Sequence, residues 1–271
     1  MIFSRSRVEL PHSFVISNMP IERKSEARFL GVIIDESLKW SRHVKTVLSK
    51  MSRYIGIMYK IKKLLPLKSR LQVFNSFIQS HVHYCSLVWG FCCKSSIEAI
   101  FSKQKKGLRA VIPGFINYKF KDGVLPGHTK PYFSEYSLLT IHNIVAQNAL
   151  LLIFKIRYFP ILVPSAVRNS IADDSPIPGS THETCENWLT NYNTSIYRGT
   201  VFFKGPMLSA LKSLNSYLDP AKFLTVKAYK NNLKRTILAL QSEGDIQEWQ
   251  NSNFITNHVT GLRKLRSNDV A

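Results

Sequence analysis

The sequence Arg28-Phe29-Leu30-Gly31-Val32-Ile33-Ile34-Asp35 opens the stretch that decides the fold, and His81-Val82-His83-Tyr84-Cys85-Ser86-Leu87-Val88-Trp89-Gly90 closes it. The first segment is short, apolar and rich in β-branched residues, and charged residues bound it on both sides. This pattern is typical of a buried β-strand. Between the two segments apolar residues recur at helical spacing, so we expect the strand to be followed by packed helices.

The residues before this strand predict further β-structure. Phe14-Val15-Ile16 is a short apolar run, Ser17-Asn18 is typical of a turn, and Pro20 to Glu22 begins a second strand. With Arg28 to Ile34 as the third strand, we expect a small antiparallel β element over residues 1–36. A sheet of this size has two faces to cover, and the following helices can cover only one of them.

Two amphipathic helices are predicted next, separated by Pro66. Pro66 stops the first helix and suits the first turn of the second. We expect the two to pack as an antiparallel pair along their apolar stripes. The first stripe, in a helix that begins near Trp40, consists of Val44, Val47, Leu48, Met51, Ile55, Met58, Ile61 and Leu65; the second consists of Leu67, Leu71, Phe74, Ile78, Val82, Cys85 and Val88.

The charge on this helical pair has one sign. From Lys39 to Arg70 the sequence contains no Asp or Glu, whereas an idle solvated helix usually mixes signs and gains from pairs of opposite charge. The whole chain has a net charge of +20 and a pI near 9.9. We therefore predict a polyanionic partner. The cations of this segment are Lys39, Arg42, Lys45, Lys50, Arg53, Lys60, Lys62, Lys63, Lys68 and Arg70.

An ordered set of residues here resembles the reverse transcriptase (RNA-directed DNA polymerase) of non-long-terminal-repeat retrotransposons. The set consists of Phe29-Leu30-Gly31-Val32 with Asp35, Leu38-x-Trp40, His43, Leu65-Pro66 and Tyr84-Cys85-x4-Trp89-Gly90. The resemblance is to the C-terminal part of that enzyme: the end of the palm, the thumb and the region beyond. It covers residues 1–114, and more weakly residues 197–240, where Tyr229-Lys230-x2-Leu233-Lys234 resembles a closing helix of the family.

The resemblance implies that the catalytic aspartates, and the Mg²⁺ they would bind, belong to a part of the polymerase upstream of residue 1. We therefore expect this chain to be inactive alone and to hold no cofactor or metal of its own. Ile171-Ala172-Asp173-Asp174 imitates the family's catalytic hairpin, but it follows the thumb region and a proline-rich loop comes after it. The family also implies a nuclear location.

The resemblance further implies a binding surface for an RNA–DNA hybrid or another nucleic-acid duplex. Phe29, Leu30 and Gly31 would support the primer strand. Phosphate contacts, which position a duplex without reading its sequence, would come from Arg42, Lys45, Arg53, Lys60, Lys62 and Lys63. A second hypothesis stays open at this point: a non-enzymatic helical module, repurposed from such an element, whose charge serves solubility or an acidic protein partner.

The remainder of the chain predicts a mainly α, α+β protein. We expect a third helix over Ser95 to Ile112, a loop over Asn117 to Tyr132, and helices over Ser137 to Tyr158 and Thr225 to Gln241. The predicted divisions are residues 1–36 (palm remnant), 37–114 (thumb-like helices), 115–196 (a helix and a proline-rich loop) and 197–271 (a C-terminal region with a frayed tail).

Metal and membrane sites are not favoured. Structural zinc sites use two spaced pairs of ligands, which the neighbouring His81, His83, Cys85, Cys92 and Cys93 do not form. Few cysteines in a chain of this length predict reduced thiols. The longest apolar runs are too short to span a bilayer, so we expect a soluble, intracellular protein.

Overall fold

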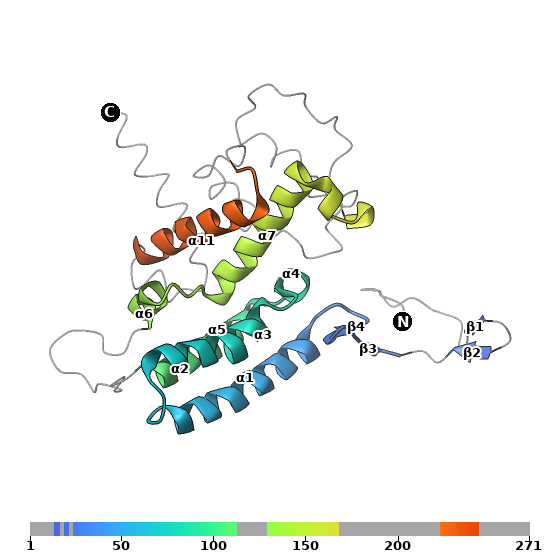
Figure 1. Cartoon of the computed structure of the whole chain (residues 1–271). Coiled ribbons are helices and arrows are strands. Elements are labelled where there is room, and N and C mark those ends of the chain that lie inside the picture. Colours follow the sequence, from blue (N-terminus) through green and yellow to red (C-terminus); the bar gives the residue numbers. More distant parts are fainter. Residues whose placement is uncertain are drawn as a thin grey trace, which may run out of the picture. The chain divides into compact units, whose positions relative to one another are not determined.

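The computed structural model describes residues 14–16, 19–21, 24–90, 92–112, 129–167 and 223–243. Helices predominate in this part of the chain, and its strands form two small antiparallel sheets (Figure 1). The predicted mainly α, α+β class is therefore confirmed. The chain divides into two compact units, unit 1 with residues 1–85 and 92–111 and unit 2 with residues 86–91 and 112–271.

The strands form hairpins of two strands each. β1 (Phe14–Ile16) pairs with β2 (Met19–Ile21), as predicted, and β3 (Glu26–Phe29) pairs with β4 (Val32–Asp35). The prediction of one strand from Arg28 to Ile34 is wrong, because the chain reverses within it. The expected three-stranded sheet is wrong for the same reason: the described strands form two separate sheets.

Leu30 and Gly31 make the reversal between β3 and β4. The register pairs Phe29 with Val32, which leaves a two-residue turn. Both turn residues have positive φ, 46° at Leu30 and 84° at Gly31, as in the primed turns whose twist suits a hairpin. Glycine adopts this conformation readily, whereas a leucine does so only when its surroundings hold it. An apolar Leu30 hides this turn from sequence reasoning.

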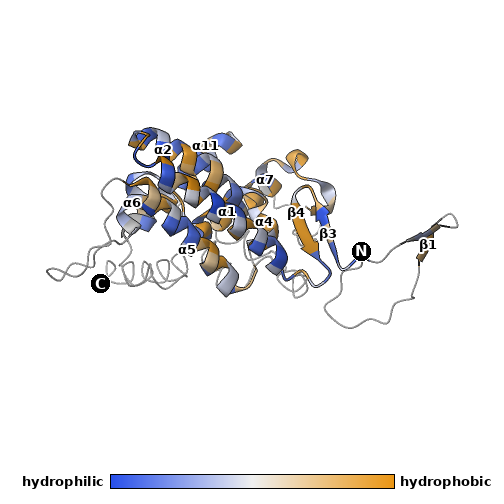
Figure 2. Cartoon of the chain, turned by 90° about the horizontal axis from the view of Figure 1, so that it is seen from below, coloured by the Kyte–Doolittle hydropathy of each residue, from blue (hydrophilic) through white to orange (hydrophobic). Residues whose placement is uncertain are grey.

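Burial of the β3–β4 hairpin is uneven. In Figure 2 β4 is hydrophobic and β3 is hydrophilic. Val32 at the start of β4 is buried, but Phe29 is 64% exposed and Leu30 74% exposed. The predicted burial of the whole segment is therefore wrong at the turn.

The first predicted helix is α1 (Ser41–Ile61), and it begins directly after Trp40 as expected. Most of its predicted stripe is buried, whereas Leu48, Ile61 and Leu65 are half-buried. The fully covered members of the stripe are Val44, Val47, Met51, Ile55 and Met58.

The second predicted helix is interrupted. It consists of α2 (Leu67–Phe74), a π-helical segment η1 (Asn75–Gln79) and α3 (Ser80–His83). Cys85 then has a positive φ of 50°, which ends the helix. The predicted continuation to Val88 is therefore wrong: the break changes the phase, so Ser86 and Trp89 are buried and Val88 is 43% exposed.

α5 (Lys94–Val111) is the predicted third helix, and its expected inner face is buried. α1 packs mainly against α5 and also touches α2, η1 and α3, so the expected two-helix pair is a three-helix core (Figure 1). In this core the π-helical segment places Gln79 where its Oε1 accepts a 2.7 Å hydrogen bond from Gln104 Nε2. A paired amide of this kind satisfies two buried polar groups at once. At the start of α5 the Cys93 carbonyl accepts hydrogen bonds from the backbone N–H groups of Ser96 and Ile97.

Unit 2 contains α4 (Ser86–Trp89), which packs on α7 (Ile141–Tyr158). A Cβ on Gly90 would lie 2.5 Å from Val145 on α7 and 2.3 Å from the Ser86 carbonyl oxygen. Real Cβ atoms do not approach so closely, so only glycine fits there. The Trp89 side chain is fully buried. The Trp89-Gly90 pair thus docks α4 on its neighbour.

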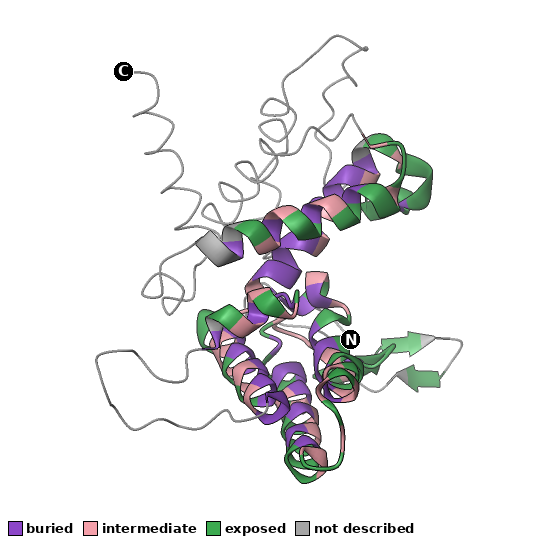
Figure 3. Cartoon of the chain, turned by 60° about the vertical axis from the view of Figure 1, so that its left-hand side comes forward, coloured by how far each residue is buried: buried purple, intermediate pink, exposed green. Residues whose placement is uncertain are grey.

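The other elements of unit 2 are α6 (Lys130–Glu135), the 3₁₀ segment η2 (Pro160–Leu162) and α11 (Val226–Glu243). α7 has no exposed residue between Ile141 and Ile156, as the purple ribbon of Figure 3 indicates. It begins at Ile141, four residues later than predicted, and α6 occupies the end of the predicted loop. α11 agrees with the predicted helix from Thr225 to Gln241.

Several predictions lie outside the described residues. These are the β-structure expected before residue 14, the Asp173-Asp174 pair, residues 197–222 of the weaker resemblance, and the C-terminal tail.

Candidate nucleic-acid interface

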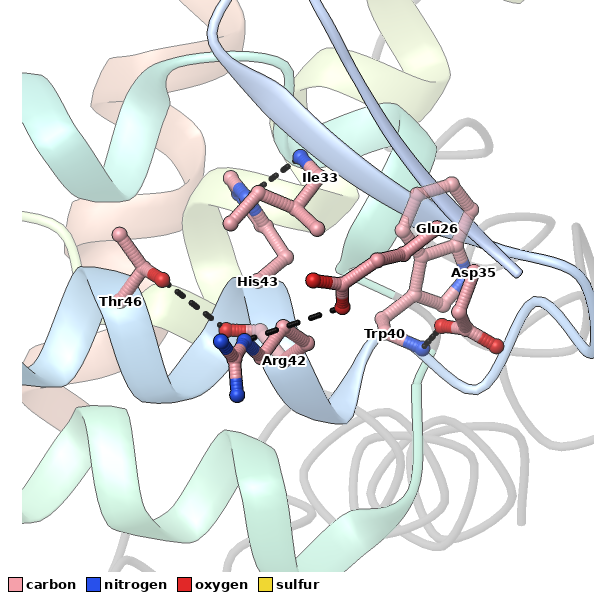
Figure 4. A network of polar contacts seen from close by, with 7 residues as sticks. All are labelled: Glu26, Ile33, Asp35, Trp40, Arg42, His43 and Thr46. Carbon is pink, nitrogen blue, oxygen red and sulfur yellow. Dashed lines mark hydrogen bonds and ion pairs between the residues drawn. The ribbon is translucent and has the colours of Figure 1, made fainter. Parts of the chain in front are cut away.

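The carboxylate of Asp35 organises the loop between β4 and α1. Its Oδ1 accepts hydrogen bonds from the backbone and hydroxyl of Ser37 and from the backbone of Lys39, and its Oδ2 accepts from the backbone of Trp40 (Figure 4). Leu38 and Trp40 both have positive φ in this loop, 53° and 64°. Such conformations are uncommon for large residues and need surrounding support, which Asp35 supplies.

The pKa of Asp35 reflects these bonds. Partial burial alone would raise the pKa of the carboxyl, but the hydrogen bonds from Ser37, Lys39 and Trp40 together lower it below its usual value. The ionised form is therefore the one that holds the loop.

Two further contacts fix the β3–β4 hairpin to the helices of unit 1. The backbone N–H of Ile33 donates to Nδ1 of His43, a buried residue of α1, over 3.3 Å (Figure 4). The hydroxyl of Tyr84, at the end of α3, donates to the carbonyl of Leu30 in the turn. The Tyr84 ring also lies 3.7 Å from the position that a Cβ on Gly31 would take. The turn is therefore anchored, although its side chains face solvent.

These contacts explain why the residues of the resemblance form one ordered set. Gly31 makes the turn, Asp35 holds the loop, and His43 and Tyr84 attach the hairpin to the helices. Tyr84, Asp35 and His43 were noticed in the sequence only as members of a motif. Their positioning roles depend on contacts that reach up to 54 residues along the chain, which spacing alone does not reveal.

The predicted primer-strand residues lie together at the tip of this hairpin. Phe29 and Leu30 are largely exposed, and Gly31 between Leu30 and β4 is exposed as well. An anchored turn with exposed apolar side chains can offer a firm surface to a strand that passes over it. The structure places these three residues on one element, whereas the predicted phosphate contacts lie on another, α1 and the turn that follows it.

The predicted phosphate contacts form one solvent-facing side of α1. At helical spacing, residues 42, 45, 53 and 60 lie on one face, separated by the small residues Ser49, Ser52 and Gly56. From Arg42 to Lys60 the helix rises about 27 Å at about 1.5 Å per residue. We call this set the α1 basic face; its exposed members are Arg42, Lys45, Arg53, Lys60 and, just beyond the helix, Lys63.

The members of the α1 basic face differ in their partners. Arg42 lies 3.8 Å from the carboxylate of Glu26 on β3, in a pair that is well exposed (Figure 4). Such exposed pairs contribute little energy, so Arg42 can exchange this partner for a phosphate. Lys45, Arg53, Lys60 and Lys63 form no ion pair in the described part of the chain. Lys62, also predicted as a contact, is half-buried and stands apart from them.

Other cations are placed less favourably for this role. Lys105 on α5 lies over the ring of Phe101, with its ammonium 4.3 Å from the ring centroid. Burial lowers the pKa of Lys105, Glu98 opposes that shift and Arg109 adds to it. Arg70 on α2 is buried. A count of charges along the sequence cannot separate these residues from the exposed ones.

Two features were missed by sequence reasoning. One is a group of stacked aromatic side chains between α1 and the η1–α3 segment. The other is a second exposed basic face, on α11, formed by Lys227, Lys230, Lys234 and Arg235. The spacing of those four cations was visible in the sequence and is the signal that could have found them.

The described residues contain no group of three or more His, Cys, Asp or Glu side chains placed to hold a metal ion. Within the described residues Cys85, Cys92 and Cys93 carry reduced thiols. Among the described helices none combines the length and apolarity needed to cross a membrane.

Comparison with known proteins finds a similarity to the polymerase of a transposon. The chain is 25% identical over 104 residues to a probable RNA-directed DNA polymerase from transposon X-element of Drosophila melanogaster. The match spans 37% of this chain and 12% of that protein. No family model matches the chain, and no solved structure matches it.

Proposed function

We propose that this chain binds a nucleic-acid duplex, an RNA–DNA hybrid above all, along the α1 basic face, as the thumb of a reverse transcriptase would. On this proposal residues 1–114 correspond to the end of the palm and the thumb of such an enzyme. The similarity to a transposon polymerase supports the class of protein. The observation on which the binding proposal depends is the α1 basic face, an exposed set of cations without acidic neighbours along the helix.

The physical argument rests on counterion release. A duplex condenses cations on its phosphates, and a protein that neutralises several phosphates releases them, so affinity falls steeply as salt rises. Cations on a helix of about 27 Å keep a fixed spacing and can contact several phosphates in a row. A duplex close to A-form is recognised by its shape and backbone, which such contacts provide.

The hairpin tip adds a second contact. Phe29 and Leu30 are exposed, and the bonds from Tyr84 and His43 hold the hairpin on the helices. We assign these side chains to the end of the primer strand, next to the duplex on α1.

A titration of the full chain with a labelled RNA–DNA hybrid tests this function. We expect the logarithm of the binding constant to fall linearly with the logarithm of the salt concentration, with a slope that corresponds to several phosphate contacts. Binding that does not respond to salt would contradict the proposal and favour the alternative, a module for an acidic protein partner.

A primer-extension assay tests the other half of the proposal, that this chain supplies binding and not chemistry. The match to the polymerase covers 12% of that protein. We expect the chain alone to add no nucleotide to a primed RNA template in the presence of Mg²⁺ or Mn²⁺. Sustained incorporation would show that the chain has a catalytic centre of its own.

A further inference from the structure

A group of partly exposed aromatic side chains in unit 1 has no part in the phosphate contacts described above. The ring of Tyr54 on α1 stacks on that of Phe77 in η1, with centroids 4.8 Å apart, and on that of His81 in α3, 5.6 Å apart. The planes in each pair differ by 27°. We call Tyr54, Phe77 and His81 the aromatic row.

The aromatic row is open to solvent. Phe77 is 43% exposed, and Tyr54 and His81 are half-buried. A phenylalanine supported by a stacked tyrosine keeps a fixed orientation while it presents ring surface to water. Grouped apolar side chains that are partly exposed and surrounded by polar residues can mark a binding site.

The row is connected to the hairpin tip. Tyr84 follows His81 by three residues, and its hydroxyl donates to the Leu30 carbonyl. Tyr84 is itself 51% exposed, and Leu30 more so. Tyr84 therefore contacts the hairpin tip and lies three residues from the row along the chain.

The charge around the row selects the kind of partner. Lys50 precedes Tyr54 by one turn of α1, and its charge also reaches His81 of the row. No Asp or Glu occurs between Glu36 and Glu98, so every charged side chain of α1, α2, η1 and α3 is a cation or a histidine. An apolar peptide has no need of such surroundings, whereas a nucleic-acid strand offers rings for the aromatic side chains and phosphates for the cations.

We propose that the aromatic row stacks unpaired bases of a single-stranded segment that continues from the duplex. The inference rests on the proposed nucleic-acid function and adds to it that bases, and not only phosphates, are recognised. Because every base has a π-face, the row accepts RNA and DNA and reads no sequence.

The test uses an RNA–DNA hybrid with a single-stranded extension and the same hybrid with an abasic extension. The two have the same phosphates and differ only in the bases. We expect the full chain to bind the natural extension roughly 5- to 150-fold more tightly, the range found for one stacked base. The preference is expected for ribose and deoxyribose extensions alike.

Phe77→Leu is expected to abolish the preference, because leucine keeps apolar volume but has no ring plane. Phe77→Tyr keeps the ring and should retain the preference, which separates stacking from any loss of folding. Ile57→Leu is the matched control, because it changes an equally exposed apolar side chain on α1. It should change neither the affinity for the hybrid nor the preference for the natural extension.

The possible failures are distinct. If the hybrid binds with the expected salt dependence but natural and abasic extensions bind equally, the stacking proposal is overturned and the proposed function stands. A preference that persists in Phe77→Leu overturns it as well. If no hybrid binds in a salt-dependent way, the proposed function itself fails.

Discussion

α1 and α11 are alike in pattern and different in surroundings. Each is an amphipathic helix with a buried apolar stripe, an exposed basic face and no acidic residue in its first turn. The tyrosine of α11, Tyr229, is fully buried and stacks on Phe154 at 3.9 Å, whereas Tyr54 of α1 belongs to the half-exposed aromatic row. Two helices with the same charge pattern therefore offer different surfaces, because the aromatic side chain beside the charge is buried on one and half-exposed on the other.

The basic faces also differ in extent. On α1 the cations from Arg42 to Lys60 span about 27 Å, and on α11 those from Lys227 to Arg235 span about 12 Å. The longer face can meet more phosphates of one duplex. We therefore assign the duplex to α1 and treat α11 as the natural control.

The largest expected effect comes from removing charge on each helix. Lys60→Gln, Lys62→Gln and Lys63→Gln together should weaken hybrid binding at least tenfold and flatten the salt slope by about one per lysine that meets a phosphate. Because Lys62 is half-buried, a change of about two in slope is expected, measured by fluorescence anisotropy across a salt series.

The matched variant on α11 is Lys227→Gln, Lys230→Gln and Lys234→Gln, which removes the same charge from the chain. Its salt slope should stay close to that of the unmodified protein. If both triple variants lose the same affinity for the hybrid, the net charge of the chain determines binding, and not the α1 basic face.

The next effect concerns how each helix begins. Asp35 accepts four hydrogen bonds ahead of α1, whereas Thr225 caps α11 with one, from the Ala228 N–H to its Oγ1 over 3.1 Å. Asp35→Ala should lower the free energy of unfolding by about 2 kcal/mol, because N–H groups of the loop lose their acceptor. Thr225→Ala should lower it by about 1 kcal/mol, the usual cost of a lost cap. Hydrogen–deuterium exchange of peptides from α1 and from α11 measures the local stability of both helices in the same protein.

Asp35→Asn is the control for this prediction, because it keeps one acceptor oxygen and should lose less stability than Asp35→Ala. Two features would be inconsistent with the account: an Asp35→Ala protein as stable as the unmodified one, or a greater loss for Thr225→Ala.

A smaller effect is expected at Gly56. This glycine lies exposed within α1, and a Cβ there would meet nothing within 4 Å. α11 has alanine at exposed positions such as Ala228. Gly56→Ala should raise the free energy of unfolding by up to about 1 kcal/mol, the difference in helix propensity, as measured by urea denaturation. A loss of stability would show that the glycine has another role.

The smallest effect depends on pH and belongs to α1 alone. Burial, and then the charge of Lys50, lower the pKa of His43. The unfolded chain has a histidine pKa near 6.5, so below that pH it binds protons that the folded chain resists. The stability from neutral His43 is therefore present above about pH 6.5 and is lost as pH falls through the lower folded-state pKa.

His43→Gln should reduce this loss, measured as the unfolding free energy between pH 7.5 and 5. Burial and the charge of Lys50 also lower the pKa of His81. The His81→Gln variant is therefore measured in parallel, to separate the contributions of the two histidines to the pH dependence. If the pH dependence is the same with and without His43, burial and Lys50 do not lower the pKa of this ring in the folded protein.

Much of the helical framework could be predicted from the sequence. The apolar residues of α1, α5 and α11 recur at helical spacing because one side of each helix is buried. These three helices therefore begin and end close to the predicted residues. The exposed cations of α1 follow from the same periodicity, because residues between the apolar positions must face outward.

The hairpin and the helix break could not be predicted in this way. A turn built on Leu30 and a helix end at Cys85 both need positive φ at residues that do not favour it. Distant bonds stabilise the turn, as from Tyr84 to Leu30, and sequence spacing contains no information about them. The aromatic row was missed for the same reason, since Tyr54 meets Phe77 only once the helices pack.

The protection of lysines from acetylation by a bound hybrid tests the central claim most directly. The reactivity of the lysines on both basic faces is measured in one protein and in one experiment. With a saturating RNA–DNA hybrid, mass spectrometry should show that Lys45, Lys60 and Lys63 lose reactivity while Lys227, Lys230 and Lys234 keep theirs. Protection of the α11 lysines with the α1 lysines still reactive would contradict the assignment of the duplex to α1.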